Sequence, residues 1–233
     1  MIRNFIFSFF FFTGIIIISL IFLPSLILPK KIVQYGGKLM GLWASFCLKN
    51  FLSTKIIVKG RENIIKNEKF FIAASHQSMF ETFFLQTIFN SPVFILKKEL
   101  TLIPIFGWYL KKIGSISIDR EKISKENLNF LEKISKIILN SDRPLIIFPQ
   151  ATRVLPKERP SFKRGVGKIF KQLNIACQPV AINSGNVWPK KGIKIPNREI
   201  TVSILKPIMP GLDREEFVKI LEKSIYNELD LIN

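Results

Sequence analysis

The feature that most constrains this chain is an uncharged apolar run close to its start. The 19 residues from Phe5 to Leu23 carry no charged side chain. As an α-helix they would rise about 28 Å, which is close to the hydrocarbon thickness of a bilayer. The run ends at Pro29-Lys30-Lys31, without the small-residue cleavage site of a secretory signal. The sequence therefore favours an uncleaved membrane helix over a cleaved signal peptide.

A second apolar stretch, Ile32 to Leu52, is interrupted by Lys38 and Lys49. Its apolar residues recur at helical spacing and include Trp43, which suits a membrane interface. Two interpretations stay open for it, a helix on or shallowly inside the membrane and a buried core helix. We therefore expect residues 1–54 to form a membrane-anchoring helix or helical hairpin, and residues 55–233 to form a separate domain.

From residue 55 onward, short apolar runs alternate with helical stretches. The near-continuous apolar character of these runs is typical of strands buried on both faces. The alternation predicts an α/β fold, a mixed and largely parallel sheet flanked by helices. The predicted strands are Ile56–Val58, Phe70–Ala74, Val93–Leu96, Ile116–Ile118, Leu145–Phe148, Cys177–Ile182 and Ile200–Leu205. The predicted helices include Glu121–Asn140 and one after Pro210-Gly211.

Composition limits the classes of partner and of site. The 233 residues include 35 Lys and Arg against 17 Asp and Glu, a formal net charge of +18. Such a charge calls for an anionic partner, which could be nucleic acid, an anionic membrane surface or an acidic small molecule. Hydrophobic residues make up 48% of the chain, which excludes a disordered protein and points to lipid. His76 is the one histidine, so a two-histidine metal site is excluded, and Cys47 and Cys177 are too few for a zinc ribbon.

His76 stands where an α/β fold places chemistry. It follows the predicted strand Phe70–Ala74, and the polar residues Gln77 and Ser78 come next. A lone histidine is often only structural, but ligands of open α/β sheets bind at the carboxyl ends of strands. If His76 lies on the loop and Glu81 in the first turn of a helix, the carboxylate can reach the imidazole. A carboxylate that holds one ring nitrogen leaves the other nitrogen to act as a base.

Two arginines also follow predicted strands. Arg120 ends the segment Gly114–Arg120, and Arg153 ends Phe148–Arg153, where Thr152 adds a hydroxyl. Arginines at strand ends are often no more than a solvated rim. Two of them beside a hydroxyl could also clamp a phosphate monoester, because guanidinium groups bind phosphate through two parallel hydrogen bonds.

Taken in order, these segments resemble the glycerolipid acyltransferases, and among them the bacterial 1-acyl-sn-glycerol-3-phosphate acyltransferases. The family's four sequence blocks correspond to His76–Glu81, Gly114–Arg120, Phe148–Arg153 and Gln178–Ile182, and the resemblance covers roughly Ile56 to Leu205. Beyond the residues named above, the resemblance includes Lys97, Asp119, Phe148, Pro149, Gln150 and Pro179.

The resemblance implies a fold, a reaction and residue roles. Residues 55–233 would be an acyltransferase domain that moves an acyl chain from acyl-CoA or acyl-carrier protein to the sn-2 hydroxyl of lysophosphatidic acid. His76 would be the general base and Glu81 the carboxylate that orients it. Arg120, Arg153 and Thr152, with Lys97 as a helper, would hold the phosphate. Neither a metal nor a cofactor is implied.

Three positions depart from the family pattern. Glu81 stands where the family has Asp, which adds a methylene between the helix and the imidazole. The family's Phe-Pro-Glu-Gly-Thr-Arg has Gln150 and Ala151 in place of Glu and Gly. If that glycine has a positive φ, alanine there costs about 1 kcal/mol or more.

The expected location is the bacterial cytoplasmic membrane. Arg3 precedes the apolar run, while Lys30 and Lys31 follow it, which favours a cytoplasmic side for the domain. We expect membrane lipid and an acidic acyl donor as partners, and no nucleic acid. The sequence leaves the oligomeric state open.

Two other functions stay open. One is an acyltransferase of the same fold with a different acceptor, such as glycerol 3-phosphate, a lysophospholipid or an acylated amino acid. The other is a basic protein without catalysis that binds anionic lipid or nucleic acid through the basic residues of 157–171, although that segment also fits a solvated helix face.

Overall fold

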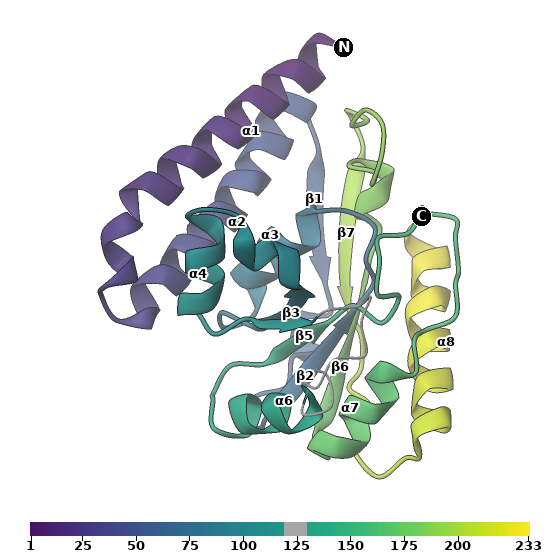
Figure 1. The fold of residues 1–233 in the computed structure, drawn as a ribbon. Coiled ribbons are helices and arrows are strands. Elements are labelled where there is room, and N and C mark those ends of the chain that lie inside the picture. Colours follow the sequence, from purple (N-terminus) through teal and green to yellow (C-terminus); the bar gives the residue numbers. More distant parts are fainter. Residues whose placement is uncertain (119–129) are drawn as a thin grey trace.

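A computed structural model describes residues 1–118 and 130–233, and these form a mixed sheet of seven strands with helices on both faces (Figure 1). The strand order is β1-β7-β6-β2-β5-β3-β4. All seven predicted strands are present, and the predicted α/β fold class is confirmed. The strands are β1 (Lys55–Lys59), β2 (Phe70–Ala74), β3 (Val93–Lys97), β4 (Ile116–Ile118), β5 (Leu145–Ile147), β6 (Ala176–Ile182) and β7 (Glu199–Ile204).

Strand direction decides where the loops meet. β2 pairs in parallel with both β5 and β6, while β7 pairs antiparallel with β6 and parallel with β1. In the central register, Ala73 lies opposite Ile147 of β5 and opposite Pro179 of β6. The carboxyl ends of β2, β5 and β6 therefore reach the same edge, and the loops that follow these strands are neighbours there.

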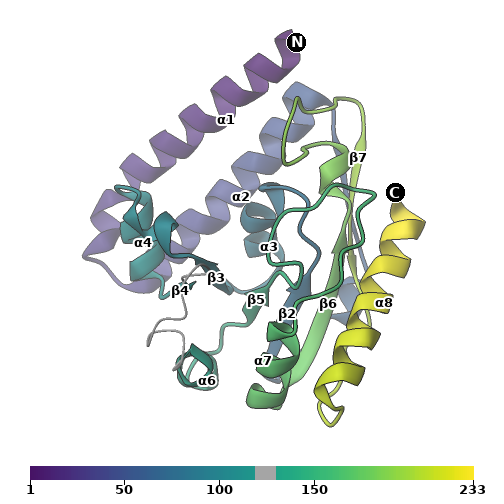
Figure 2. The same cartoon turned by 45° about the vertical axis from the view of Figure 1, so that its right-hand side comes forward.

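Successive side chains of each central strand enter two different cores, which explains the continuous apolar runs. In β2, Ile72 and Ala74 face one core, whereas Phe71 and Ala73 face the other. Helices α1, α2 and α3 cover the first core, and α6, α7 and α8 cover the second (Figure 2). The helices are α1 (Ile2–Ile21), α2 (Lys30–Leu52), α3 (Phe80–Ile88), α4 (Phe106–Lys112), α6 (Phe130–Leu139), α7 (Gly165–Leu173) and α8 (Arg214–Ile232).

The helix predicted for Glu121–Asn140 is observed as α6, from Phe130 onward. Its earlier part lies outside the described residues, as do two residues of the predicted site, Asp119 and Arg120.

The two N-terminal helices form a hairpin (Figure 1). The 3-10 turn η1 (Leu23–Leu26) joins them, so Pro24 lies in the turn that ends α1. Helix α2 has a buried face that includes Ala44 and Leu48, and an exposed apolar face that includes Leu42 and Phe46. The buried-core interpretation therefore holds for one face of α2, and contact of its exposed face with the membrane stays a prediction.

One side of α1 is docked on the domain. Phe7 and Phe11 are buried, and their rings meet the edge of Trp188 at centroid distances of 5.2 and 5.0 Å. Asn4 forms two hydrogen bonds with the backbone of Lys194, of 2.6 and 2.8 Å. The N-terminal half of α1 is thus packed against the segment between β6 and β7, and lipid cannot surround it on that side.

The other side of α1 is apolar and exposed. Within the described residues, α1 is the helix that is long and apolar enough to cross a membrane, with a mean hydropathy of 2.3. Exposed apolar side chains also lie just after η1, at Ile27 and Leu28, and on α2, the 3-10 helix η3 (Lys98–Leu102) and α4, where Trp108 is half exposed. Exposed apolar side chains in such number are typical of a partner or membrane site. The large exposed side chains on α1 include Phe5, Phe9, Phe12, Ile16, Ile17 and Ile21.

We expect a chain that starts at Ile32 to lose most integral membrane attachment while keeping salt-sensitive adsorption to anionic vesicles. The truncation removes the apolar surface of α1 but leaves a basic domain that anionic lipid attracts. Extraction of membranes with carbonate and with high salt measures the effect. If the truncated chain resists both treatments, α1 is not the anchor.

The truncation also uncovers Trp188, so a full-length variant is the matched control. Replacing the outward Phe5, Phe9 and Phe12 with serine retains the inward Phe7 and Phe11. This variant should also shift toward the salt-extractable fraction, with its fold intact by circular dichroism.

Candidate active site

His76 lies on the loop between β2 and α3, and three neighbours fix it there. The His76 backbone N–H donates to Oε1 of Gln150 at 2.8 Å, and its carbonyl accepts from the N–H of Val154 at 2.9 Å. The imidazole stacks on the ring of Phe148 with a centroid distance of 4.0 Å. The first and third sequence blocks are therefore in direct contact at the carboxyl edge of the sheet.

Ser75, the residue before His76, is also held by hydrogen bonds. The Ser75 N–H donates to the carbonyl of Val180, and the Ser75 hydroxyl bonds to both the carbonyl and the N–H of Ile182. These bonds tie the loop to β6, the strand of the fourth block, which includes Pro179.

Glu81 is the second residue of α3, and its side chain is fully buried. Its carboxylate accepts hydrogen bonds from the N–H groups of Gln77 and Ser78 and from the hydroxyl of Ser184. Free N–H groups at a helix start favour a negative charge, and a buried carboxylate needs such donors. The local sequence thus creates a carboxylate site in the first turn of α3.

The imidazole and the carboxylate face each other. Nδ1 of His76 lies 3.7 Å from Oε2 of Glu81, and Nδ1 is buried without a hydrogen-bond partner in the part of the chain that the structure describes. This distance is longer than a hydrogen bond, as is common in sites without substrate. Because Nδ1 is buried and faces Glu81, Nε2 is the nitrogen left for an acceptor hydroxyl.

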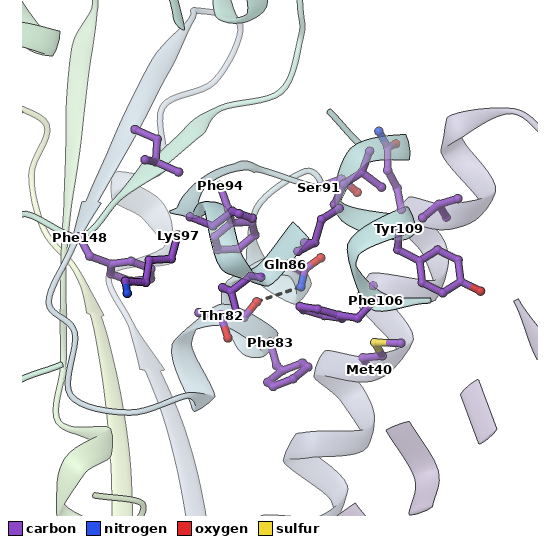
Figure 3. A pocket seen from close by; sticks show the side chains of 18 of the residues that line it. Met40, Thr82, Phe83, Gln86, Ser91, Phe94, Lys97, Phe106, Tyr109 and Phe148 are labelled. Atoms are coloured by element: carbon purple, nitrogen blue, oxygen red, sulfur yellow. Dashed lines mark hydrogen bonds between the residues drawn. The ribbon is translucent and has the colours of Figure 1, made fainter. Parts of the chain in front are cut away.

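A cavity of about 410 Å³ opens at His76 and Phe148, a volume within the usual range of ligand sites, about 300–1,000 Å³. Figure 3 shows Phe148 and Lys97 at one end of the lining and Tyr109 at the other. The side chains between them come from α2, α3, β3 and α4, and most are apolar (Figure 3). The apolar side chains that line the cavity include Val33, Met40, Phe83, Phe94, Leu96, Phe106 and Leu110.

Arg143 borders the same cavity and is a residue that the sequence did not indicate. Its guanidinium donates to the carbonyls of Ser91 at 2.5 Å, Ile113 at 2.6 Å and Pro92 at 3.3 Å. Burial lowers the pKa of Arg143 from its usual value, but arginine remains charged in proteins. Arg143 therefore fixes the segments before β3 and β4 that border the cavity.

Of the predicted phosphate-binding residues, Lys97, Thr152 and Arg153 line the cavity together with His76. Lys97 ends β3, and its ammonium lies 3.1 Å from Oε1 of Glu99. No described residue holds the half-buried Arg153 guanidinium by a hydrogen bond or ion pair. Arg120 lies outside the described residues, so its part in the clamp stays a prediction.

The sequence profile of the family described as "Acyltransferase" matches residues 55–183, more than half of the chain. The chain belongs to the acyltransferase family. The match begins with β1 and ends directly after β6, so it includes all four blocks.

Several relatives of this acyltransferase-family chain are named 1-acyl-sn-glycerol-3-phosphate acyltransferase. The protein of Pseudomonas aeruginosa is 36% identical over 58% of this chain and 52% of its own length. The Saccharomyces cerevisiae protein is 31% identical over 76% of this chain and 59% of its own, and the Helicobacter pylori protein is 31% identical over 67% of each. The chain thus spans between half and two thirds of the length of these relatives.

A solved structure shares the fold over the whole chain. The crystal structure of the 1-acyl-sn-glycerophosphate (LPA) acyltransferase PlsC from Thermotoga maritima has a TM-score of 0.81, with 22% sequence identity. The superposition covers 100% of this chain and 98% of that one. The N-terminal hairpin therefore belongs to the shared fold together with the sheet.

The remaining motif residues have structural contacts. Oε1 of Gln77 accepts from the N–H of Gly185, and the hydroxyl of Ser78 accepts from the N–H of Phe80 at the start of α3. The Pro149 carbonyl accepts from the N–H of Lys163 before α7. Gly114 has a φ of +77°, which explains why the turn before β4 uses glycine.

Besides Arg143, two further residues near the site were missed by sequence reasoning. Ser184 contacts Glu81 from 103 positions away, and the Lys190 ammonium donates to Oγ1 of Thr152 at 3.3 Å. A weak signal existed for Ser184, since Asn183-Ser184 is a polar pair directly after a buried strand. No pattern marked Lys190 among the many lysines.

The departure at Ala151 has the expected backbone strain, since its φ is +60°. We expect Ala151→Gly to raise the free energy of unfolding by about 0.5–1 kcal/mol, because relief of the left-handed strain outweighs the greater entropy of an unfolded glycine. The melting temperature should rise by about 1–4 °C in a chain of this length. Ala181→Gly in β6, where φ is not positive, is the control and should lower it. A lower melting temperature for both variants would mean that Ala151 is not strained.

Proposed function

We propose that this acyltransferase-family chain transfers an acyl group from an acyl thioester to the sn-2 hydroxyl of 1-acyl-sn-glycerol 3-phosphate, which gives phosphatidic acid. The observation that carries the proposal is the His76–Glu81 pair at the opening of an apolar cavity, beside Lys97, Thr152 and Arg153. A base, an apolar chain site and cations in one place match an acceptor that has a hydroxyl, an acyl chain and a phosphate. The names of the relatives support the same reaction.

In the proposed step, Nε2 of His76 takes the proton of the acceptor hydroxyl as the oxygen attacks the thioester carbonyl. The C–O bond forms, the C–S bond breaks, and the thiolate leaves with the proton that the imidazolium returns. The buried Glu81 carboxylate, 3.7 Å from Nδ1, stabilises the transient imidazolium and keeps the ring oriented. The reaction balances without a metal, a cofactor or an acyl-enzyme intermediate.

The phosphate would be held at the cation-lined part of the cavity. Arg153 can offer a bidentate fork, Thr152 a hydroxyl and Lys97 a point charge, and Lys190 adds a further cation next to Thr152. Arg120 is proposed as a second arginine of this clamp on the resemblance alone. With the phosphate fixed, the glycerol hydroxyl would lie within hydrogen-bond reach of His76, which makes the transfer effectively intramolecular.

The apolar part of the cavity would hold an acyl chain, since apolar side chains such as Phe83, Phe94 and Phe106 line it. We propose that the exposed apolar surface of α1 and α2 lies in the cytoplasmic membrane of a bacterial cell, with the domain on the cytoplasmic side. The acyl donor would be acyl-CoA or acyl-carrier protein, both acidic and thus attracted by the net charge of +18.

An acceptor panel tests the proposal. Purified full-length protein in anionic vesicles would receive an acyl thioester together with lysophosphatidic acid, glycerol 3-phosphate, lysophosphatidylcholine or monoacylglycerol. We expect lysophosphatidic acid to be acylated with the highest kcat/KM. Preference for another acceptor, or RNA binding tighter than vesicle binding without any acylation, would overturn it.

A further inference from the structure

Ser184 begins the 3-10 turn η4 (Ser184–Asn186) after β6, one residue beyond the stretch that matches the family. Its side chain is fully buried, and its hydroxyl lies 2.6 Å from Oε1 of Glu81. An ionised carboxylate can only accept, so the serine hydroxyl is the donor. A charge-assisted bond of this length is at the strong end for hydroxyl donors.

The donors around Glu81 are divided unevenly between its two oxygens. Oε1 accepts from the N–H groups of Gln77 at 2.9 Å and Ser78 at 3.0 Å, and from Ser184. Oε2 has one longer bond, 3.1 Å from the Ser78 N–H, and faces Nδ1 of His76. The three donors on Oε1 thus fix the rotation of the carboxylate and leave Oε2 for the imidazole.

Ser184 reaches the carboxylate from a different part of the chain than the two backbone donors. Gln77 and Ser78 lie on the loop just before α3, whereas Ser184 lies in η4, which follows β6. Without Ser184, the longer glutamate side chain could pivot about its backbone contacts. This matters here because Glu81 has one more methylene, and one more rotatable bond, than the aspartate of the family pattern.

Hydrogen bonds of the neighbouring backbone hold Ser184 in position. Its carbonyl accepts from the N–H groups of Val187 at 3.1 Å and Trp188 at 2.8 Å, and the next N–H, that of Gly185, donates to Oε1 of Gln77. Trp188 is packed against Phe7 and Phe11 of α1. The turn that carries Ser184 is therefore tied to Gln77 and, through Trp188, to α1.

We propose that Ser184 is a positioning residue of the acyl transfer, which locks the Glu81 carboxylate so that Oε2 stays aligned with Nδ1 of His76. The proposal rests on the proposed function. Ser184 touches no reacting atom, so its loss should slow the chemical step and leave acceptor binding nearly unchanged.

The experiment compares four variants of the full-length protein in the acylation assay. Ser184→Ala and Ser184→Cys remove the hydroxyl, and cysteine preserves the size of the side chain but is a weak donor. Ser184→Thr retains the hydroxyl. Ser203→Ala is the matched control, because the buried Ser203 hydroxyl on β7 donates to Oε1 of Glu228 at the same 2.6 Å, and neither residue lines the cavity.

We expect Ser184→Ala and Ser184→Cys to lower kcat by about 10- to 100-fold, with the acceptor KM changed by no more than about 2-fold. Ser184→Thr should retain most of the wild-type kcat. Ser203→Ala should have a lower melting temperature than the wild type but an unchanged kcat. If Ser184→Ala does not fold, the kcat of Ser184→Cys tests the loss of the hydroxyl.

A folded hydroxyl-free variant with wild-type kcat would overturn the proposal, as would a Ser203→Ala that loses as much kcat as Ser184→Ala. If the wild type forms no phosphatidic acid, the proposed function fails instead, so the two failures are distinguishable.

Discussion

Replacing His76 with alanine is expected to lower kcat by a factor on the order of 10²–10⁴, with little change in the acceptor KM, because a general base acts mainly in the transition state. His76 is the one histidine of the chain, and Nδ1 faces the Glu81 carboxylate. A neighbouring imidazole therefore cannot take over its proton transfer. Initial rates of phosphatidic acid formation at varied acceptor concentration separate kcat from KM.

The variant must be shown to be folded, because the His76 ring is stacked on Phe148. The backbone bonds of His76 to Gln150 and Val154 do not involve the imidazole and should survive the change. A folded His76→Ala protein with unchanged turnover would rule out this base.

Replacing Arg153 with alanine is expected to lower kcat/KM for lysophosphatidic acid by about 10- to 100-fold. This corresponds to the loss of hydrogen bonds from a charged donor to phosphate, about 1.5–3 kcal/mol. Arg153→Lys should be impaired less, because lysine keeps the charge but lacks the bidentate fork. A neutral monoacylglycerol has no phosphate, so the kcat/KM for this acceptor should be almost unchanged in both variants. The test is to assay both acceptors with both variants.

Arg164→Ala is the control for the loss of a positive charge, because Arg164 is exposed and does not line the cavity. Arg164→Ala should change the kcat/KM for either acceptor by no more than about 2-fold, as expected of a surface substitution. Equal proportional losses on the two acceptors in Arg153→Ala would mean that this arginine supports the fold or the thioester, and the phosphate clamp would be wrong.

The strands could be predicted because their residues are apolar on both faces. Phe70–Ala74 was predicted with the bounds that the structure gives it, and its side chains alternate between two cores. The strand order could not be predicted, since nothing in the sequence indicates that β7 inserts between β1 and β6.

Part of the site could also be predicted, because it depends on local spacing. Glu81 lies five positions after His76, which suits a loop residue followed by the first turn of a helix, and this is the observed arrangement. The bond from Ser184 and the contact of Lys190 with Thr152 join segments that only the sheet topology makes neighbours. No local pattern could indicate them.

The N-terminal run shows another limit of pattern reasoning. Most residues of α1 are apolar, so the composition predicts a helix in contact with lipid but does not distinguish its two sides. Packing of Phe7 and Phe11 on Trp188 decides that one side faces the protein. The same contacts connect α1 to the turn that carries Ser184.

The most direct test of the central claim is a mass balance for the wild-type protein in anionic vesicles. Lysophosphatidic acid and an acyl thioester are supplied, and the free thiol released and the phosphatidic acid formed are measured together, the lipid by mass spectrometry. Acyl transfer from the His76 site to a phosphorylated lysolipid predicts one phosphatidic acid for each thiol, with the new acyl chain at sn-2. Thiol release without a lipid product, which would indicate transfer to water, would contradict the account.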